Sequence, residues 1–589
     1  MKRLFSLILI LCLISSLAGC GDSSSADYSV SFALDGIPSS LDPQIASSRS
    51  ELTVIYNTFE GLTRFNRDGS YSLAAAQSYS VSEDNLTYTF TLRSGAKWSD
   101  GEDVTAQDFV FGLRRAVKPE TKCPTVENFF SIANAQSVYK GEADASELGV
   151  YSKGSDTVII TLSSPDNNLM RTLALAAAMP CREDFFESTS GKYGLSASNY
   201  ISNGPFYVKR WAQDTESNSL RIVKSRDYNG SVEAKPASVV LYFNDTSDHI
   251  TSVSEQQMNA AYLSASFYKS ASSAKLNTEY NSDINYVLSL NSAAPVFATE
   301  NMRRIFAASV DRDLIASKLT EGYEMSSSVV GRGYYCGEVK YEPCTDSVIK
   351  YDPSAADGYL SELEYEKALL EQRIAESTAE SEPDSPDAAQ ADGSNEGYSD
   401  GTDGESSGTT AESAVSPYES VYPPWDTVTE VSTDFTLIYP EGGCMSEIAT
   451  AIANCWEKAF GIVVNTKAMT EKELISVTSS GNYYAAVIPV YSTDAEAESI
   501  IRSFSSGSIS NKYKYVNEEY DRLADAAIYS NTVSNDDEIR SAERYLISTG
   551  SFIPLVSGGS IIIFMTGVSD IYFAGTYGYI DFSSAVNAS

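Results

Sequence analysis

Histidine is almost absent from this chain of 589 residues, which contains only His249. His249 lies in the polar stretch NDTSDHI, typical of a surface turn, and no nucleophile motif lies beside it. A hydrolase that uses a histidine base would depend on this one residue. The sequence therefore disfavours an enzyme and indicates no catalytic residue.

Basic residues are also scarce. Lys and Arg together number 42, against 79 Asp and Glu, and the formal net charge is −37. A surface of this charge repels nucleic acids and anionic lipid headgroups, and no basic stripe is present to overcome the repulsion. Nucleic acid is therefore excluded as a partner.

Apolar runs long enough to cross a bilayer are missing; the run GSIIIFMTGV at 559–568 has the length of a buried strand. At the N-terminus, Lys2 and Arg3 precede an apolar run that ends near Leu17, which is the layout of a secretory signal. The ending LAGC, residues 17–20, resembles a bacterial lipobox, which implies removal of residues 1–19 and acylation of Cys20. We therefore expect an extracytoplasmic protein, lipid-anchored to the bacterial cell membrane through the tether 20–27. The alternative is an ordinary signal peptide that contains a cysteine.

Cysteines are few and form no CxxC pair, so we expect neither a metal nor a cofactor. Six remain besides Cys12 and Cys20, and an even number in an exported protein favours disulfides. The six are Cys123, Cys181, Cys336, Cys344, Cys444 and Cys455. Cys336 and Cys344 flank a turn and are candidates for a local disulfide, and Cys123 with Cys181 is a second candidate. Cys444 and Cys455 should not pair, because a helix containing Cys455 would separate them. The alternative is that some of the six are buried free thiols.

The stretch KWSDGEDVTAQDFVFGLRR, residues 97–115, places four acids around one turn, as a calcium loop does. The ligand pattern is incomplete, because the fourth acid, Asp108, falls inside a helical pattern. Thr105 can be the N-cap of that helix, with Asp108 three residues later as the capping-box acid. Phe109 and Leu113 then follow at helical spacing. The stretch therefore predicts a turn and a helix start rather than a metal or catalytic site.

Strand-like alternation recurs along the chain between helical patterns, which predicts an α/β fold. The clearest runs are YSVSFAL, LTYTFTLR, TVIITLS, LRIVKS and SVVLYFN. Residues 376–419 differ in composition, since they hold twelve acids and no Lys or Arg among Ser, Gly, Ala and Pro. Almost nothing in this segment can be buried to offset chain entropy, so we predict a disordered acidic insert after a charged helix.

Several segments in order resemble the family 5 extracellular solute-binding proteins, and above all the oligopeptide-binding lipoproteins of peptide ABC transporters. They are SSLDPQIASSRSELTVIYNTFEGLTRFNRDGS (39–70), SYSVSEDNLTYTFTLRSGAKWSDGEDVTAQDFVFGLRRAV (78–117), SNGPFYVKRW (202–211), INYVLSLNSAAPVFATENMRRIFAASVDRDLI (284–315) and YDPSAADGYL (351–360). The resemblance implies a type II periplasmic-binding-protein-like clamp with two main lobes and an extra lobe. Lobe I would comprise residues 28–70, 200–275 and 552–589, the extra lobe II residues 71–199, and lobe III residues 276–551.

The resemblance also implies a function. The protein would be a monomer that captures short peptides between its lobes and delivers them to the permease subunits of an ABC transporter. The alternatives are a lipoprotein of the same fold that binds a non-peptide ligand, and one that acts as a sensor or chaperone without transport.

Site residues follow from the same resemblance. The loop of Ala46, Ser47, Ser48 and Arg49 would offer backbone groups, and Val490, Tyr491, Ser492, Thr493 and Asp494 would form the facing strand. Peptide main chain would be held like an added strand, and an acidic residue would meet the ligand's amino terminus.

Two departures from the family bear on the facing strand. The family has Trp-Cys-Ala-Asp here, whereas this chain places its acid one residue later, at Asp494, and Pro489 lacks the N–H that a pairing strand donates. Either a bulge near Pro489 turns Asp494 into the cleft, which we favour slightly, or Thr493 faces the ligand.

Tyrosine pairs are a further candidate for the cleft. Tyr334 with Tyr335 and Tyr483 with Tyr484 can either line the cleft or pack in sheets, and packing is the commoner role of such residues.

Overall fold

The computed structural model describes residues 28–212, 218–243, 248–337, 339–380, 425, 428–494, 496–530, 535–574 and 579–588. The predicted signal, the lipobox with Cys20 and the tether lie outside these residues. In the described part of the chain, no helix combines the length and the apolar character needed to cross a membrane.

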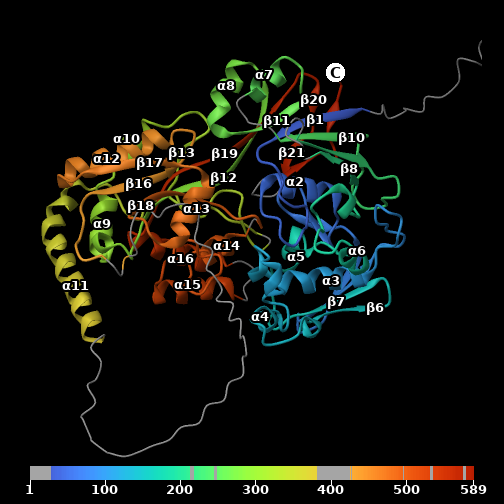
Figure 1. The fold of residues 1–589 in the computed structure, drawn as a ribbon, viewed down its shortest axis with the longest axis horizontal. Coiled ribbons are helices and arrows are strands. Elements are labelled where there is room, and N and C mark those ends of the chain that lie inside the picture. Colours follow the sequence, from blue (N-terminus) through green and yellow to red (C-terminus); the bar gives the residue numbers. More distant parts are fainter. Residues whose placement is uncertain are drawn as a thin grey trace, which may run out of the picture.

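An eleven-stranded mixed sheet runs through the molecule (Figure 1). Its order is β17-β16-β18-β12-β19-β11-β1-β10-β9-β8, and β13 pairs with β19 off this path. The bounds in that order are Val464–Met469, Phe435–Pro440, Ala485–Val490, Asn277–Leu290, Phe552–Phe564, Ala260–Ser264, Ser29–Leu34, Ser238–Phe243, Ser219–Lys224 and Phe206–Ala212, with β13 at Glu324–Met325. The strands expected from YSVSFAL, LRIVKS and SVVLYFN are β1, β9 and β10.

The long strands β12 and β19 join the two halves of this sheet. All thirteen residues of β19 are buried, and the register of the pair shifts between Asn281 and Ile284 and again between Tyr286 and Val287. A Cβ on Gly559 would lie 1.8 Å from the Asn281 carbonyl oxygen. A glycine is therefore required where the two strands approach each other at the shift.

The buried apolar residues form three hydrophobic cores. The first core draws on residues between 30 and 271 and between 561 and 585, whereas the other two draw on residues between 287 and 556. Strand β19 contributes Ile561 to the first core, Leu555 to the second and Phe552 to the third. Strand β19 thus contributes to all three cores, while β12, β16 and β18 each contribute to the second and the third.

A second, four-stranded antiparallel sheet has the order β4-β5-β7-β6. Its strands are Ala76–Val81, Thr87–Leu92, Thr157–Thr161 and Val150–Lys153, so the runs LTYTFTLR and TVIITLS also form strands. Helix α3 (Ala106–Val117) packs against β6 and β7 (Figure 1).

The stretch 97–115 starts this helix, as predicted. The Thr105 N–H donates to Asp108 Oδ2 at 2.8 Å, and the buried Trp98 donates its Nε1–H to the same oxygen at 3.0 Å. Of the other acids, Asp103 pairs with Lys97 and Asp100 with Arg182. The described residues contain no group of three side chains placed to hold a metal ion.

Helices cover the half of the large sheet that begins at β17. They are α9 (Glu300–Ala308), α11 (Tyr359–Glu380), α12 (Met445–Phe460), α13 (Glu471–Ser480), α14 (Ala497–Arg502), α15 (Glu518–Ile528) and α16 (Asp536–Ser548). Because α11 runs to Glu380, the prediction that disorder begins at residue 376 is wrong for its first five residues, which continue the helix. The rest of the acidic insert, residues 381–419, lies outside the described residues.

The prediction for His249 is corrected by its burial. His249 does not lie in a surface turn: its side chain is 3% exposed at the start of α7 (His249–Ser254), and its Nδ1 lies 3.3 Å from the Tyr262 carbonyl oxygen. Helix α7 packs against β11 and so covers the residue.

The predicted disulfides Cys336–Cys344 and Cys123–Cys181 are not formed, since all six cysteines of the described chain are free. The Cys181 thiol accepts a hydrogen bond from Arg115 at 3.4 Å, and the Cys123 sulfur lies 3.7 Å from Thr125 Oγ1. Each of these two thiols thus packs against a different neighbour. Five of the six are buried, as in the alternative of free thiols, and Cys444 and Cys455 do not pair, as predicted.

Candidate functional site

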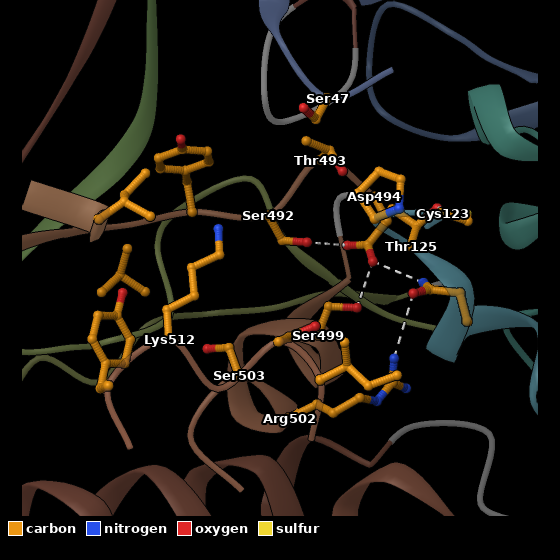
Figure 2. Close-up of a pocket in the computed structure, with 18 of the residues that line it drawn as sticks. Ser47, Cys123, Thr125, Ser492, Thr493, Asp494, Ser499, Arg502, Ser503 and Lys512 are labelled. Atoms are coloured by element: carbon orange, nitrogen blue, oxygen red, sulfur yellow. Dashed lines mark hydrogen bonds between the residues drawn. The ribbon is translucent and has the colours of Figure 1, made fainter. Parts of the chain in front are cut away.

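A cavity of about 580 Å³ lies where the loop before α2 (Arg49–Thr58), the segment after α3 and the segment after β18 meet. It is lined by Ser47 and by parts of 119–128, 474–478, 488–494 and 499–513. Figure 2 shows side chains from these segments facing one space. We call it the first cavity. A concave site enclosed by separately packed parts of a chain is the usual form of a small-molecule site.

Asp494 is held in the wall of the first cavity by the chain itself. Its Oδ1 accepts hydrogen bonds from Ser492 Oγ at 2.7 Å and from the Glu496 N–H at 3.0 Å. Its Oδ2 accepts from Asn128 Nδ2 at 2.7 Å and from Ser499 Oγ (Figure 2). The side chain is 1% exposed, so its carboxylate joins the segment after β18 to the segment after α3.

The backbone explains why both Thr493 and Asp494 line the cavity. Strand β18 ends at Val490, and its pairing with β12 runs in unbroken register from Val490 to Ala485. The predicted bulge near Pro489 is therefore absent, and Thr493 and Asp494 lie in a turn, where strand alternation does not apply. Strand β12 pairs all of β18, whereas β16 pairs only Ala485 and Ala486, so residues 487–490 have a strand partner on one side only in the described part of the chain.

On the opposite wall, only Ser47 of the four predicted loop residues lines the cavity. Ser48 is the N-cap of α2 and forms a capping box with Glu51, and the N–H groups of Ser47 and Ser48 both donate to Glu51 Oε2 at 3.1 Å. Burial opposes ionisation of Glu51, but hydrogen bonds from Ser39, Ser47 and Ser48 outweigh it and lower the pKa of Glu51. These two N–H groups are therefore used in the N-terminal cap of α2 and do not point to a ligand as donors.

The other two loop residues point elsewhere. Ala46 is buried and its N–H donates to the Asp42 carbonyl at 3.1 Å, while the Arg49 guanidinium lies 4.3 Å from the centre of the Tyr262 ring. Of the predicted loop, Ser47 thus reaches the cavity, while the backbone N–H groups of Ala46, Ser47 and Ser48 are used within the protein.

The predicted tyrosine pairs pack in the interior and do not line the first cavity. The Tyr334 hydroxyl accepts from the Ser492 N–H at 2.8 Å and supports the segment after β18 from behind. Tyr483 bonds to Ser289 Oγ at 2.9 Å, Tyr484 stacks on Phe435, and Tyr335 donates to the Asp68 carbonyl. The tyrosines that do line the cavity are Tyr139, Tyr491 and Tyr513.

Cations in the first cavity were missed by sequence reasoning. Lys122, Arg502 and Lys512 line it, and the Lys512 side chain is exposed to the cleft (Figure 2). Enclosure by the surrounding protein lowers the pKa of the Lys512 ammonium, with nearby Glu471 opposing the shift. No motif marks these residues, because Lys122 is hundreds of residues away from Arg502 and Lys512 in the sequence.

The fold and the cavity define a multi-lobed α/β ligand-binding protein. Its family is shown by sequence: the profile described as "Bacterial extracellular solute-binding proteins, family 5 Middle" matches residues 70–512, and the chain belongs to this family. Members of this family are solute-binding proteins, and the resemblance noted in the sequence is confirmed.

Relatives of known name are distant. The oligopeptide-binding protein OppA of Bacillus subtilis is 28% identical over 295 residues, which cover 49% of this chain and 53% of that protein. The probable deoxycholate-binding periplasmic protein YgiS of Escherichia coli is 30% identical over 295 residues, covering 48% and 53%. The chain thus spans about half the length of these relatives.

The fold is that of solved solute-binding proteins. A structure described as Listeria monocytogenes OppA bound to peptide superposes with a TM-score of 0.70 at 19% identity, covering 96% of this chain and all of that one.

Proposed function

We propose that the protein is an extracytoplasmic lipoprotein that encloses short peptides in the first cavity and delivers them to an ABC importer. The observation that carries this proposal is the pairing of two segments across one cavity. Ser47 and residues 490–494, which the family resemblance assigns to peptide binding, line it from opposite sides. Membership of the family and the peptide-bound relative of the same fold support it.

The lobes that would close on the peptide follow the family resemblance rather than the cores, because the first core spans lobes I and II and the other two lie mainly in lobe III. We assign residues 28–70, 200–275 and 552–589 to lobe I, 71–199 to an extra lobe II, and 276–551 to lobe III. The hydrogen bond from Asn128 to Asp494 then joins lobe II to lobe III, so the described conformation has the cavity closed on that side.

A ligand in the first cavity would meet hydroxyl groups and a cation. Ser492, Thr493 and Ser503 line it beside Lys512, whose ammonium can bind a carboxylate or another anionic group. Asp494 already accepts four hydrogen bonds from the protein, so Lys512 is the charged group that we expect a ligand to contact. We propose that Lys512 binds the anionic end of the ligand.

Native mass spectrometry of the protein as purified tests the function. We expect a bound mass that tandem fragmentation identifies as one or more short peptides, released intact on denaturation. A Lys512→Met variant should retain less of that mass than a Lys514→Met variant, whose exposed lysine does not line the cavity. A single non-peptide mass would contradict peptide capture.

The same cation supports a second candidate, which is capture of an amphipathic organic anion. The Asp494 carboxylate already has its hydrogen-bond donors, whereas Lys512 offers a cation, and this combination suits an organic acid without an ammonium group. One relative is described as a probable deoxycholate-binding protein. Binding of cholate or deoxycholate, with no binding of di- to pentapeptides in isothermal titration calorimetry, would favour this candidate.

A further inference from the structure

A second cavity, of about 770 Å³, adjoins the first. The two share Asn128, Tyr139, Arg502 and Ile509 in their linings. The second cavity extends between parts of residues 127–172 and parts of residues 496–535. A ligand in the first cavity therefore needs only to pass Asn128 and Arg502 to place a side chain in the second.

Two buried glutamates line the second cavity, and each is 2% exposed. Glu496 Oε2 accepts a hydrogen bond from Asn128 Nδ2 at 3.2 Å. Glu498 Oε1 accepts from Asn535 Nδ2 at 2.7 Å and from Asn168 Nδ2 at 3.3 Å. The other oxygens, Glu496 Oε1 and Glu498 Oε2, are buried without a hydrogen-bond partner in the described part of the chain. A buried acceptor left without a donor is unfavourable, and a donor from a ligand removes that cost.

The charges around these oxygens favour a cation. Besides the two glutamates, the lining includes Glu127, Asp166, Asp521 and Asp525, against the two cations Lys140 and Arg502. The Arg502 guanidinium donates to Asn128 Oδ1 at 3.4 Å, so its recorded hydrogen bond goes to the amide that bridges the two cavities. Burial raises the pKa of Glu496, the neighbouring Asp494 and Glu498 raise it further, and the positive charge of Arg502 opposes the shift. Burial also raises the pKa of Glu498.

We propose that Glu496 and Glu498 form a subsite for the basic side chain of a peptide whose main chain lies in the first cavity. The subsite rests on the proposed peptide-binding function and adds to it a preference for lysine or arginine at one position. A lysine or arginine side chain is long, and its terminal N–H groups donate to carboxylates in charge-assisted hydrogen bonds, which would supply the donor that these glutamates lack. The ligand's amino terminus would stay in the first cavity.

Binding of the basic side chain should release a proton from Glu496. Where Glu496 is protonated in the empty protein, its carboxyl O–H bond breaks as the ligand cation arrives, the carboxylate keeps the electron pair, and the proton passes to the buffer. Binding of a basic side chain should therefore release protons, and binding of its neutral analogue should not.

Isothermal titration calorimetry with Ala-Lys-Ala and Ala-norleucine-Ala, in two buffers of different ionisation enthalpy, tests the subsite. The parent should bind the lysine peptide about 10- to 100-fold more tightly, the range for hydrogen bonds to a charged group. It should release protons only with that peptide. The doubly substituted Glu496→Gln/Glu498→Gln protein should lose both the preference and the proton release. Glu364→Gln, which removes an exposed charge that lines neither cavity, should keep both.

Each other outcome is decisive. Equal affinity of the parent for the two peptides would overturn the subsite while leaving peptide binding intact. No binding of either peptide would overturn the proposed function and the subsite with it. N-acetylated Ala-Lys-Ala should keep its advantage over N-acetylated Ala-norleucine-Ala, and loss of the advantage on acetylation would assign the glutamates to the amino terminus instead. Thermal unfolding of every variant shows that a lost preference does not come from a lost fold.

Discussion

The Asp494 carboxylate accepts four hydrogen bonds from the protein itself. Substitution of Asp494 should therefore affect stability as well as ligand binding. The sequence led us to expect that Asp494 meets the ligand's amino terminus, an assignment that stays a prediction. In the structure its four donors come from Asn128, Ser492, Glu496 and Ser499. Its removal therefore disturbs the contact between the segments after α3 and after β18.

We expect Asp494→Asn to lower the free energy of unfolding by about 1 to 3 kcal/mol, because donors aimed at a carboxylate lose their acceptor. The affinities for free-amine and N-acetylated peptides should fall together. Chemical denaturation and calorimetry measure the two effects. A loss confined to free-amine peptides would instead identify Asp494 as the group that binds the ammonium.

Glu496 makes stability depend on pH. Burial raises its pKa in the folded protein above the ordinary value of the unfolded chain. Between those two values the folded state holds a proton that the unfolded state has lost, so stability is greatest below the unfolded pKa and falls as pH rises through the folded one.

Glu496→Gln should therefore raise the free energy of unfolding at pH 8 by about 1 to 3 kcal/mol, the cost of a buried unsatisfied group. It should also flatten the decline in stability that sets in as pH rises above the ordinary pKa of a glutamate, followed from pH 5 to pH 8. Urea denaturation across that range measures both, with the exposed Glu364→Gln as a control that should follow the parent. A variant curve parallel to that of the parent would contradict the assignment.

At the scale of elements, the acidic turn before α3 shows how local sequence builds a helix start. Asp108→Ala removes the acceptor of both the Thr105 N–H and the buried Trp98 indole N–H. We expect a loss of about 1 to 3 kcal/mol in unfolding free energy, with ligand affinity unchanged. Asp103→Ala breaks only an exposed ion pair with Lys97 and should cost less than about 1 kcal/mol. Equal effects of the two substitutions, measured by thermal unfolding, would refute the capping role.

The second prediction at this scale is that the acidic insert contributes little to stability. Deletion of residues 381–419, which retains α11 to Glu380, should change the unfolding free energy by less than about 1 kcal/mol, because long surface insertions add little loop-closure entropy. Differential scanning calorimetry of the deletion variant measures this change. A drop of several kcal/mol would indicate that the segment packs on the protein.

At the scale of the whole molecule, the predicted anchor decides where the protein works. Cys20→Ala should leave the product unprocessed or soluble, because no thiol is present to receive the lipid. Membrane fractionation with detection of the precursor measures the outcome. If the processed variant still sediments with membranes, then residues other than Cys20 hold the protein there.

Sequence alone determined the features that depend on near neighbours. The start of α3 follows from Thr105 and Asp108, three residues apart, and strands β1, β5, β7, β9 and β10 follow from alternation within single runs. Family and fold followed from several motifs in order. These features were predictable because the interactions that form them lie within a few residues, or because whole segments preserve a family pattern.

Tertiary structure decided the features that depend on distant partners. Asn128 reaches Asp494 across 366 positions of sequence, and the same packing buries His249 and directs the Cys181 thiol to Arg115 rather than to a second sulfur. The unpartnered oxygens of Glu496 and Glu498 are defined only by what surrounds them once the chain has folded. A charge's environment is set by every segment packed around it, and a linear pattern contains the charge but not that environment.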